Sequence, residues 1–366
     1  MDSIKLFAVG DISLIWKKEP DPFKHIKPIL MEKDILFGNL EAVLSVTGRR
    51  AEKAVLLNTN PNNIIYLKET GFDILNLANN HIFDLGVEGF NRTLDILYQN
   101  KIEFIGVVNN KYLNKYSIIK KGNIRLGFLG YSDCGLIDSK NNIMINKIEE
   151  ENIEKDIKKI KESCDIVILS LHWGIEKVFY PSPNQIKLAH KLIDIGANII
   201  LGHHPHVLQG IEKYKSGIIA YSLGNFQFEF YPQECNGKDS KRTNQTVILS
   251  LSISNQGIND YDIIPVKINE DYCPISPDDN EKKEIIQFVS CISKPLTNGE
   301  INEKWWFGEI STEYVIGNYK SWMVGIRKYG FKHLLQFLKW LVGPFNMKCY
   351  FGFIRRKLKR SDKGIN

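Results

Sequence analysis

The chain has 366 residues, of which 43% are hydrophobic and 25% are charged, so it is an ordinary globular protein long enough for one large domain or two. The formal net charge is +6, and the six cysteines are scattered without a C-x-x-C pair, which argues against the disulfide framework of a secreted protein. The stretch before Asp11 is too short for a signal-peptide core, and no apolar run reaches the roughly 18 residues that span a bilayer. We therefore expect a cytoplasmic protein.

Five apolar runs along the chain are predicted as buried strands, and each leads directly into polar side chains. In chain order they are Ile4 to Val9 before Asp11, Asp34 to Phe37 before Asn39 and Glu41, Asp73 to Ala78 before Asn80, His81 and Asp84, Asp165 to Leu171 before His172, and Ala197 to Leu201 before His204 and His206. In open α/β sheets, functional groups collect beyond the carboxyl ends of the strands. We therefore expect these side chains to converge at a common sheet edge.

Helical stretches alternate with these strands, which predicts an α/β fold. The expected helices are Asn62 to Glu69, Val87 to Gln99, Glu149 to Glu162, and Pro183 to Ile195. Turn residues predict a hairpin that joins Tyr116 to Lys120 with Arg125 to Tyr131, and a second strand pair that joins Val247 to Ser254 with Tyr261 to Ile268. We expect the second pair to belong to another sheet that packs on the first.

The residue types at the strand ends suit a metal site. Three of the eight histidines fall within residues 203–206, where His204 and His206 form an H-x-H pair. Carboxylates, asparagine carbonyls and imidazoles together favour Mn²⁺, Fe or Zn²⁺ over Ca²⁺, and six or more candidate ligands leave room for one or two divalent metal ions. Taken singly, Asp11 could instead cap the next segment, and the asparagines could be turn formers.

Six sequence blocks, in unbroken order between Ile4 and Phe230, resemble the bacterial CapA family of capsule or poly-γ-glutamate biosynthesis proteins. They are GDIS at Gly10, GNLE at Gly38, LANNHIFDLG at Leu77, HWGIE at His172, GHHPHVLQG at Gly202 and YSLGNFQF at Tyr221. The resemblance implies a calcineurin-like metallophosphatase fold, in which a four-layer β-sandwich is flanked by helices.

The same resemblance implies a role for each residue of the motifs. Asp11 would open the metal site, Glu41 with Asn39 would replace the bridging aspartate, and Asn80 would bind metal. His81 would face the substrate phosphate as a catalytic residue together with Asp84. His172, His204 and His206 would complete the metal ligands, while Glu176 and Asn225 would line the substrate pocket or hold a turn.

The chain departs from the wider phosphatase pattern at two positions. Ser13 stands where those enzymes have the histidine of D-x-H, and the second motif reads Gly38-Asn39-Leu40-Glu41 instead of G-D-x-x-D. The CapA family shares both changes. They predict a weaker or single metal site and leave ordinary phosphomonoesterase activity open.

The C-terminal part of the chain has a different charge pattern. Residues 314–361 contain eleven Lys or Arg and no acidic residue, so subtracting eleven from +6 leaves the rest near −5. Aromatic and aliphatic residues recur there at helical spacing, which predicts a basic amphipathic helix at the inner membrane face or on a synthase partner. The alternative is that the aromatics pack back on the domain and the charges are solvated; nucleic acid is a weaker candidate. We divide the chain into a metallophosphatase-fold domain over 1–270 and an extension over 271–366.

Three functions remain open from the sequence. The first is a metal-dependent phosphoesterase-like hydrolase that serves capsule or exopolymer synthesis. The second is a non-catalytic accessory subunit of a membrane polymer synthase. The third is a module that binds an anionic polymer, such as poly-γ-glutamate or an acidic glycan, without cleaving it.

Overall fold

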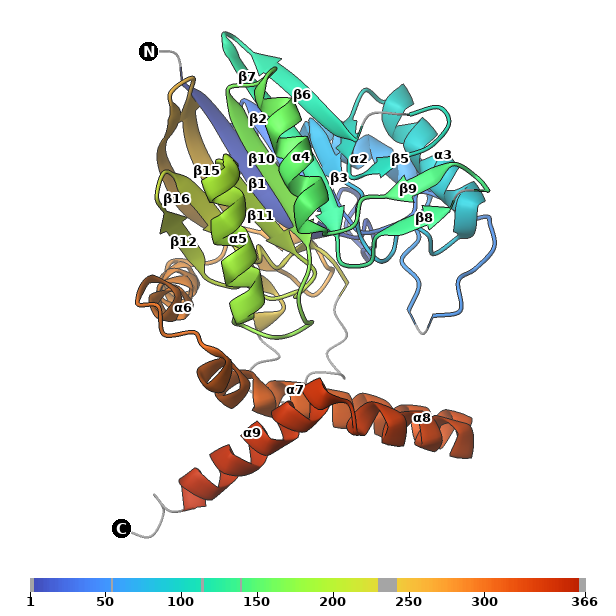
Figure 1. The fold of residues 1–366 in the computed structure, drawn as a ribbon. Helices are drawn as coiled ribbons and strands as arrows, with labels where there is room; N and C mark the ends of the chain where they lie inside the picture. Colours follow the sequence, from blue (N-terminus) through green and yellow to red (C-terminus); the bar gives the residue numbers. More distant parts are fainter. Residues whose placement is uncertain (1–2, 54, 113–114, 139, 230–241, 362–366) are drawn as a thin grey trace.

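Two β-sheets packed face to face form the centre of the molecule, and helices cover their outer faces (Figure 1). The structure is a computed structural model that describes residues 3–53, 55–112, 115–138, 140–229 and 242–361. The first sheet runs in the order β17 (Pro274–Ile275), β16 (Gly257–Ile268), β15 (Gln245–Ser254), β1 (Ile4–Ile12), β2 (Ile35–Leu40), β3 (Ile74–Asn76) and β4 (Glu103–Ile105), and β14 (Asn225–Gln227) also pairs with β1.

The second sheet carries the remaining long strands. Its order is β12 (Ile211–Tyr214), β13 (Gly217–Ala220), β11 (Ile199–His203), β10 (Ile166–His172), β7 (Ile124–Ser132) and β6 (Tyr116–Lys121). A small third sheet consists of β5 (Val107–Val108), β9 (Ile143–Ile145) and β8 (Leu136–Asp138).

Alternate residues of the central strands face different cores. On β1, Leu6 and Ala8 lie in the core between the two sheets, whereas Phe7 and Val9 lie in the core under the helices of the first sheet. On β10, Ile168 faces the first of these cores, and Leu169 faces the helices of the second sheet. Both faces of these strands are therefore buried, which is why their sequences are continuous apolar runs.

Helices close the sandwich on both sides. The first sheet is covered by α1 (Lys27–Leu30), η1 (Pro61–Asn63), α2 (Ile64–Thr70) and α3 (Gly86–Gln99), and the second by α4 (Glu150–Lys161) and α5 (Pro183–Ile195). Helix α5 begins with a capping box, in which Ser182 and Gln185 exchange hydrogen bonds, and it ends before Gly196. The predicted four-layer α/β sandwich flanked by helices is confirmed.

Two details of the predicted arrangement are wrong. The strand pair β15 and β16 belongs to the first sheet, because β15 runs antiparallel along β1 from Ile4 opposite Ile253 to Ala8 opposite Leu249. The second sheet is built instead around β10 and β11. The five motif-bearing strands are thus divided between the sheets: β1, β2 and β3 lie in the first, and β10 and β11 in the second.

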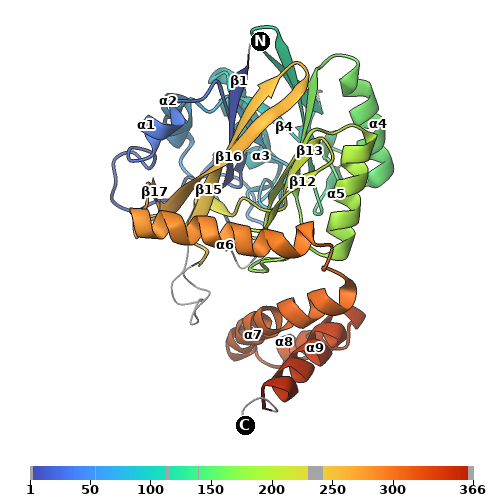
Figure 2. The same cartoon turned by 90° about the vertical axis from the view of Figure 1, so that its left-hand side faces the viewer.

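The C-terminal part is a chain of four helices, α6 (Asp279–Thr297), α7 (Glu303–Tyr329), α8 (Phe331–Leu341) and α9 (Pro344–Ser361). Helix α6 crosses one end of the sheets (Figure 2), and its Ile285, Val289 and Ile292 join the core between them. The boundary predicted at residue 270 stays a prediction; of the two elements that follow it, β17 is a strand of the first sheet and α6 packs on the sheets.

Helices α7, α8 and α9, which we call the tail, stand below the sandwich (Figures 1 and 2). The sequence predicted one amphipathic helix in this region, whereas the chain turns at Gly330 and again at Gly343. Among the described helices, none combines the length and apolar character needed to cross a bilayer. The cytoplasmic location stays a prediction.

Candidate metal centre

The predicted ligands converge where the carboxyl ends of strands from both sheets meet. Within the first sheet, Asp11 of β1 stands opposite Asn39 of β2 on one side and Asn225 of β14 on the other. Within the second sheet, His172 of β10 stands opposite His203 of β11. Side chains from the two sheets are in direct contact, since His203 Nδ1 lies 3.1 Å from Asp11 Oδ1.

Two glycines allow the backbone to approach closely enough to form this site. A Cβ atom on Gly10 would lie 1.9 Å from the carbonyl oxygen of Gly224, and one on Gly202 would lie 1.8 Å from that of Tyr221. No other residue fits at either position without moving the backbone. Each glycine immediately precedes a site residue, Asp11 or His203.

Asp11 is fully buried and is surrounded by donors. Its Oδ1 accepts a hydrogen bond of 2.8 Å from Asn39 Nδ2, and its Oδ2 lies 3.3 Å from His206 Nδ1. Burial alone would raise the pKa of Asp11, but the contacts with His203 and His206 outweigh it and hold the pKa well below its usual value. Asp11 is therefore an ionised carboxylate.

Glu41 lies at the centre of the cluster and is fully buried, yet neither of its carboxylate oxygens has a hydrogen-bond partner among the described residues. Its Oε1 is 3.6 Å from His172 Nε2 and 3.8 Å from His206 Nε2. Desolvation raises the pKa of Glu41 well above its usual value, against the opposing charge of His206. A buried carboxylate without partners is costly unless a cation binds it.

Two groups of potential ligands share Glu41. Asp11, Glu41 and His172 place ligand atoms within 4.8 Å of one another, and so do Glu41, His204 and His206. Within the part of the chain that the structure describes, the buried imidazole nitrogens of His203 (Nε2) and His204 (Nδ1) likewise have no hydrogen-bond partner. These carboxylate and imidazole groups together provide ligand atoms that fit one or two divalent metal ions.

Hydrogen bonds assign the orientation of the His206 ring. Its Nδ1 lies 2.9 Å from Asn225 Oδ1 and also faces Asp11, so a neutral ring carries its proton on Nδ1 and leaves Nε2 toward Glu41. Burial would lower the pKa of His206, but the charges of Glu41 and Asp11 raise it to about 10. Without a metal ion, His206 is thus the cation that balances the carboxylates.

His172 and His204 differ from His206 in charge. Burial lowers the pKa of His172 well below its ordinary value, and it lowers that of His204 to about 4. His172 Nε2 lies 2.8 Å from Asn80 Oδ1, which connects the third strand end to the cluster. Both imidazoles are neutral, as metal ligation requires.

The backbone of the histidine turn is strained. His204 and His206 have φ angles of 94° and 57°, a left-handed region that side chains with a Cβ rarely adopt. Such conformations cost about 1–3 kcal/mol each and persist where the surrounding structure imposes them. Here the turn points both rings toward Glu41.

His81 belongs to a separate hydrogen-bonded unit at the edge of the cluster. Its Nδ1 lies 2.5 Å from Asp84 Oδ2, while Lys53 donates to Asp84 Oδ1 at 2.8 Å and to the carbonyl oxygen of Asn80. Burial would raise the pKa of Asp84, but His81 and Lys53 lower it below the ordinary value. An ionised Asp84 therefore fixes the His81 ring and leaves its Nε2 for other contacts.

Three predicted residues occupy positions that sequence alone did not specify. Asn39 donates to Asp11 and accepts from Asn76 at 2.9 Å, so it bridges the two side chains by hydrogen bonds. Asn225 holds His206, as described above. Glu176 lies on the turn after β10, and the charge of His206 lowers its pKa against the partial desolvation of its carboxylate. The predicted roles of these residues remain predictions.

Sequence reasoning left out three members of the site. His203 was the first histidine of the triplet and could have been included on that ground. Asn76 lies inside a predicted strand, where an asparagine gives no signal of a site. Its hydrogen bond with Asn39 shows that it belongs to the cluster. Lys53 lies far from every motif, and no sequence signal connects it with Asp84.

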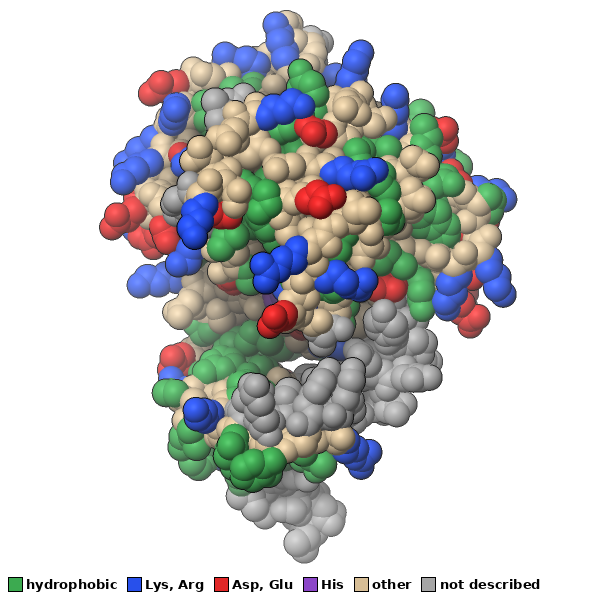
Figure 3. Space-filling model, turned by 90° about the vertical axis from the view of Figure 1, so that its right-hand side faces the viewer, with side chains coloured by type: hydrophobic (Ala, Val, Ile, Leu, Met, Phe, Trp, Pro, Cys, Tyr) green, Lys and Arg blue, Asp and Glu red, His purple; other side chains and the backbone are tan. Residues whose placement is uncertain are grey.

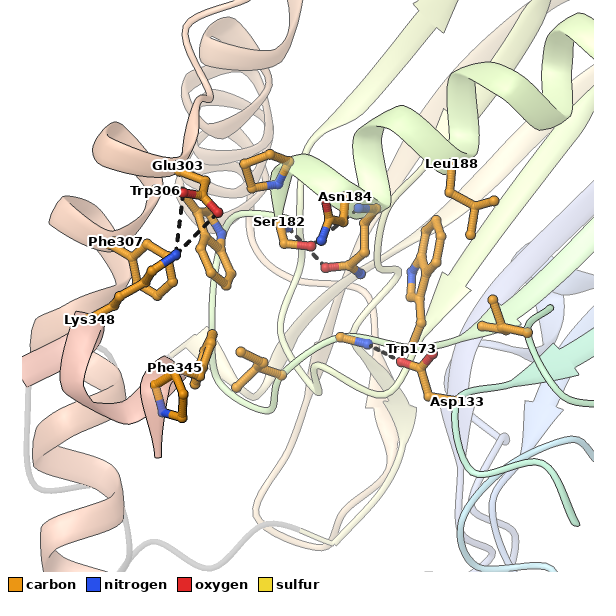
Figure 4. A pocket seen from close by; sticks show the side chains of 16 residues that line it. Asp133, Trp173, Ser182, Asn184, Leu188, Glu303, Trp306, Phe307, Phe345 and Lys348 are labelled. Atoms are coloured by element: carbon orange, nitrogen blue, oxygen red, sulfur yellow. Dashed lines mark hydrogen bonds and ion pairs between the residues drawn. The ribbon is translucent and has the colours of Figure 1, made fainter. Parts of the chain in front are cut away.

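A pocket of about 490 Å³ lies between the turn after β10 and the tail (Figure 4). Trp173, which follows His172 in the chain, lines it from one side, and Trp306, Phe307 and Phe345 line it from the tail. An ion pair between Glu303 and Lys348 lies at the tail side of the pocket. The lining contains none of the predicted metal ligands.

Comparison with known proteins identifies a family for most of this sandwich. The family model described as bacterial capsule synthesis protein PGA_cap matches residues 5–229. The chain is 33% identical over 260 residues to the capsule biosynthesis protein CapA of Bacillus anthracis, an alignment that covers 68% of the chain and 61% of that protein. It is 31% identical to the PGA biosynthesis protein CapA of Bacillus subtilis, in an alignment that covers 72% of the chain and 70% of that protein.

The chain therefore spans about three fifths of the Bacillus anthracis relative's length. Among solved structures, a calcineurin-like phosphoesterase from Bacillus subtilis aligns with a TM-score of 0.42 and 16% identity, over 80% of the chain and 97% of that protein.

Proposed function

Because the chain belongs to the family of the bacterial capsule synthesis protein PGA_cap, we propose that it is a metal-dependent, phosphoesterase-type hydrolase that serves capsule or poly-γ-glutamate synthesis. The observation that carries the proposal is Glu41. Its two buried oxygens have no hydrogen-bond partner among the described residues, and it shares one group of ligand atoms within 4.8 Å with Asp11 and His172 and another with His204 and His206. A site that only supported the fold would pair such a carboxylate.

The residues at the site would have different roles. Asp11, Glu41, His172, His204 and His206, with the carbonyl of Asn80, would hold the metal. A bound divalent cation would polarise a phosphoryl oxygen and acidify a water molecule. Asn225 orients His206, and Asp84 orients His81 so that its Nε2 can contact a substrate phosphate or a leaving group. The substrate would be a phosphoester or another group on an anionic polymer.

Ser13 supports a second candidate, an accessory or polymer-binding subunit without turnover. The hydroxyl of Ser13 accepts a hydrogen bond from the backbone N–H of Ile15, so it serves the local turn. This position therefore adds no imidazole to the Asp11 side of the cluster. A less complete ligand set would bind metal more weakly and could hold an anionic polymer without cleaving it.

The experiment that tests the proposal combines metal analysis with turnover on the full chain. Protein purified without added metal is assayed for Mn, Fe and Zn content, and then for hydrolysis of a panel of phosphomonoesters and phosphodiesters. The His206→Ala variant is expected to lose both metal and turnover. His25→Ala is the matched control, because His25 is exposed and pairs with Glu19, which is not one of the predicted ligands.

Three results would decide between the candidates. Turnover that disappears in His206→Ala and persists in His25→Ala supports the hydrolase. Bound metal with no turnover on any phosphoester supports the accessory or polymer-binding subunit. A wild-type chain that binds no divalent metal would refute both metal-based functions.

A further inference from the structure

The tail carries exposed hydrophobic side chains on each of its three helices. Figure 3 shows hydrophobic side chains gathered on the tail, at the lower end of that face. Of the seventeen large hydrophobic residues that are exposed in the described chain, nine lie between residues 316 and 354, so the tail holds more of them than the much longer remainder. Exposed apolar side chains that cluster in this way mark an interaction surface.

These side chains form stripes along the helices. On α8, Phe331, Leu335, Leu338 and Val342 follow one another at intervals of four, three and four residues, which places them on one helical face. Met347, Phe351 and Ile354 repeat the pattern on α9, and Ile316 and Tyr319 lie three residues apart on α7. We call these nine residues the apolar stripes.

The stripes are not the tail's own core. That core consists of other side chains, among them Trp306, Ile310 and Cys349, which are buried where α7 packs on α9. Trp306 also donates a hydrogen bond of 2.9 Å to the carbonyl oxygen of Tyr180, which fastens the tail to the sandwich. Between α7 and α8, the Trp322 ring contacts the rings of Phe337 and Trp340 at tilted angles. These tryptophans and Phe337 thus form inner contacts, and the stripes remain outside.

The charge of the same segment is of one sign. Residues 314–361 have eleven Lys or Arg and no Asp or Glu. Lys339 on α8 and Arg355 on α9 are exposed next to the stripes, one residue after Leu338 and Ile354 respectively. A surface that combines apolar stripes with adjacent cations complements a layer that is apolar inside and anionic outside.

We propose that the apolar stripes of the tail are a docking surface for an anionic lipid bilayer, so that the protein binds peripherally through α8 and α9. The stripe side chains enter the acyl boundary, and the lysines and arginines contact lipid phosphates. The helices lie in the plane of the interface, because none of those described is built to cross it. This inference is independent of hydrolytic activity and goes beyond the proposed function.

The charge pattern favours a bilayer over a protein partner or a second copy of the chain. Two tails of like sign would repel each other across a two-fold interface. A protein interface is usually depleted in Lys and centred on one patch, whereas here the stripes extend along three helices that point in different directions (Figure 1). A membrane surface accommodates such a spread because it is laterally continuous.

Vesicle binding by the full chain tests the proposal. Three proteins are compared: the wild type, the double variant Leu335→Glu/Leu338→Glu and the double variant Ile65→Glu/Tyr98→Glu. Each protein is incubated with phosphatidylcholine vesicles, with or without phosphatidylglycerol, and flotation separates the vesicle-bound protein from the free protein. Ile65 and Tyr98 are exposed at 42% and 63% on α2 and α3, so the second variant adds the same charge to exposed apolar positions far from the tail. Circular dichroism and metal content verify the fold of each variant.

We expect wild type and the Ile65/Tyr98 variant to float with phosphatidylglycerol vesicles at low salt, and the Leu335/Leu338 variant to bind at least about 10-fold more weakly. High salt should reduce wild-type binding. The proposal is overturned if the wild type binds neither vesicle, or if the Leu335/Leu338 variant binds like wild type. It is also overturned if ultracentrifugation shows a stable dimer that this variant dissociates. None of these results depends on turnover, so failure here leaves the proposed function intact.

Discussion

The metal centre and the tail both contain groups without partners, but of opposite chemical kinds. At the centre, the oxygens of Glu41 are buried and polar, and no described residue forms a hydrogen bond with them. On the tail, residues such as Phe331 and Val342 are apolar and 72% and 68% exposed. Buried polar groups usually have hydrogen-bond partners, and large apolar side chains are usually buried. The metal centre departs from the first rule and the tail from the second, so we infer a cation as the ligand of the centre and a bilayer as the ligand of the tail.

The difference also concerns how firmly each region is fixed. Residues of the centre come from both sheets and are held by hydrogen bonds between strands, strained backbone and obligatory glycines. The tail is fastened through a small core around Trp306. A site that selects a cation needs fixed donors, whereas a surface that meets a fluid interface needs only area and charge.

The strongest way to break the comparison is to remove the shared carboxylate. Glu41→Gln should weaken divalent metal binding by at least about 100-fold, above the roughly 10- to 100-fold typical of outer-sphere partners, because Glu41 belongs to both ligand groups. Titration calorimetry of the metal-free protein measures the effect. Glu32→Gln, at an exposed position, is the control. Unchanged affinity in Glu41→Gln would mean that the cluster is not a metal site.

A smaller effect is expected from the unit that orients His81. Asp84→Asn should reduce turnover by about 100-fold, because a neutral amide holds the His81 ring less firmly than the carboxylate does, while the metal content stays unchanged. Lys53→Met should reduce turnover less, since Lys53 does not contact His81 and, at 38% exposed, can be replaced at Asp84 by water. Steady-state rates across pH measure both. Loss of metal in Asp84→Asn would assign Asp84 to the ligands instead.

The affinity for metal should depend on pH. The pKa of His206 is raised to about 10 in the metal-free protein, so a metal ion that binds this ring must displace its proton. The pKa of Glu41 is also raised above its usual value. The affinity should therefore rise about tenfold per pH unit for each displaced proton and level off above a pH of about 10. Calorimetry in buffers of different ionisation enthalpy counts the protons. The His206→Ala variant should release one proton fewer than the wild type when it binds metal.

The same raised pKa predicts how the stability of the metal-free protein changes. Because the folded pKa of His206 lies above its ordinary value of 6.5, this residue contributes stability that is complete below that value and is lost as pH rises toward about 10. Thermal unfolding across this range, compared with His206→Ala, isolates the contribution. A variant with the same pH dependence as wild type would contradict it.

The smallest effect is expected on the tail surface. Leu335→Glu should change the free energy of unfolding by no more than about 0.5 kcal/mol, because the side chain is 47% exposed. By contrast, Leu169→Ala in the core of the second sheet should cost about 2–5 kcal/mol. Chemical denaturation measures both. A large loss in Leu335→Glu would show that the stripe is buried by another part of the protein.

By itself, the sequence determined the motif-bearing strands, the two strand pairs, four of the helices and most of the candidate ligands. Continuous apolar runs define strands buried on both faces, as in β1 and β10, and the capping residues place α5 over Pro183–Ile195. The residues that follow each strand could be named because functional groups collect beyond the carboxyl ends of such strands. These signals are local, and so they can be read from neighbouring positions in the chain.

Only the tertiary structure decided which strands share a sheet and which donors are left without partners. The assignment of β15 to β1 depends on pairing between residues about 250 positions apart, as in Ile4 opposite Ile253. The contacts of Lys53 with Asp84 and of Asn76 with Asn39 are equally invisible in the sequence. The central position of Glu41 follows from the approach of two sheets, and the exposure of the apolar stripes follows from the packing of three helices, since both depend on contacts between distant residues.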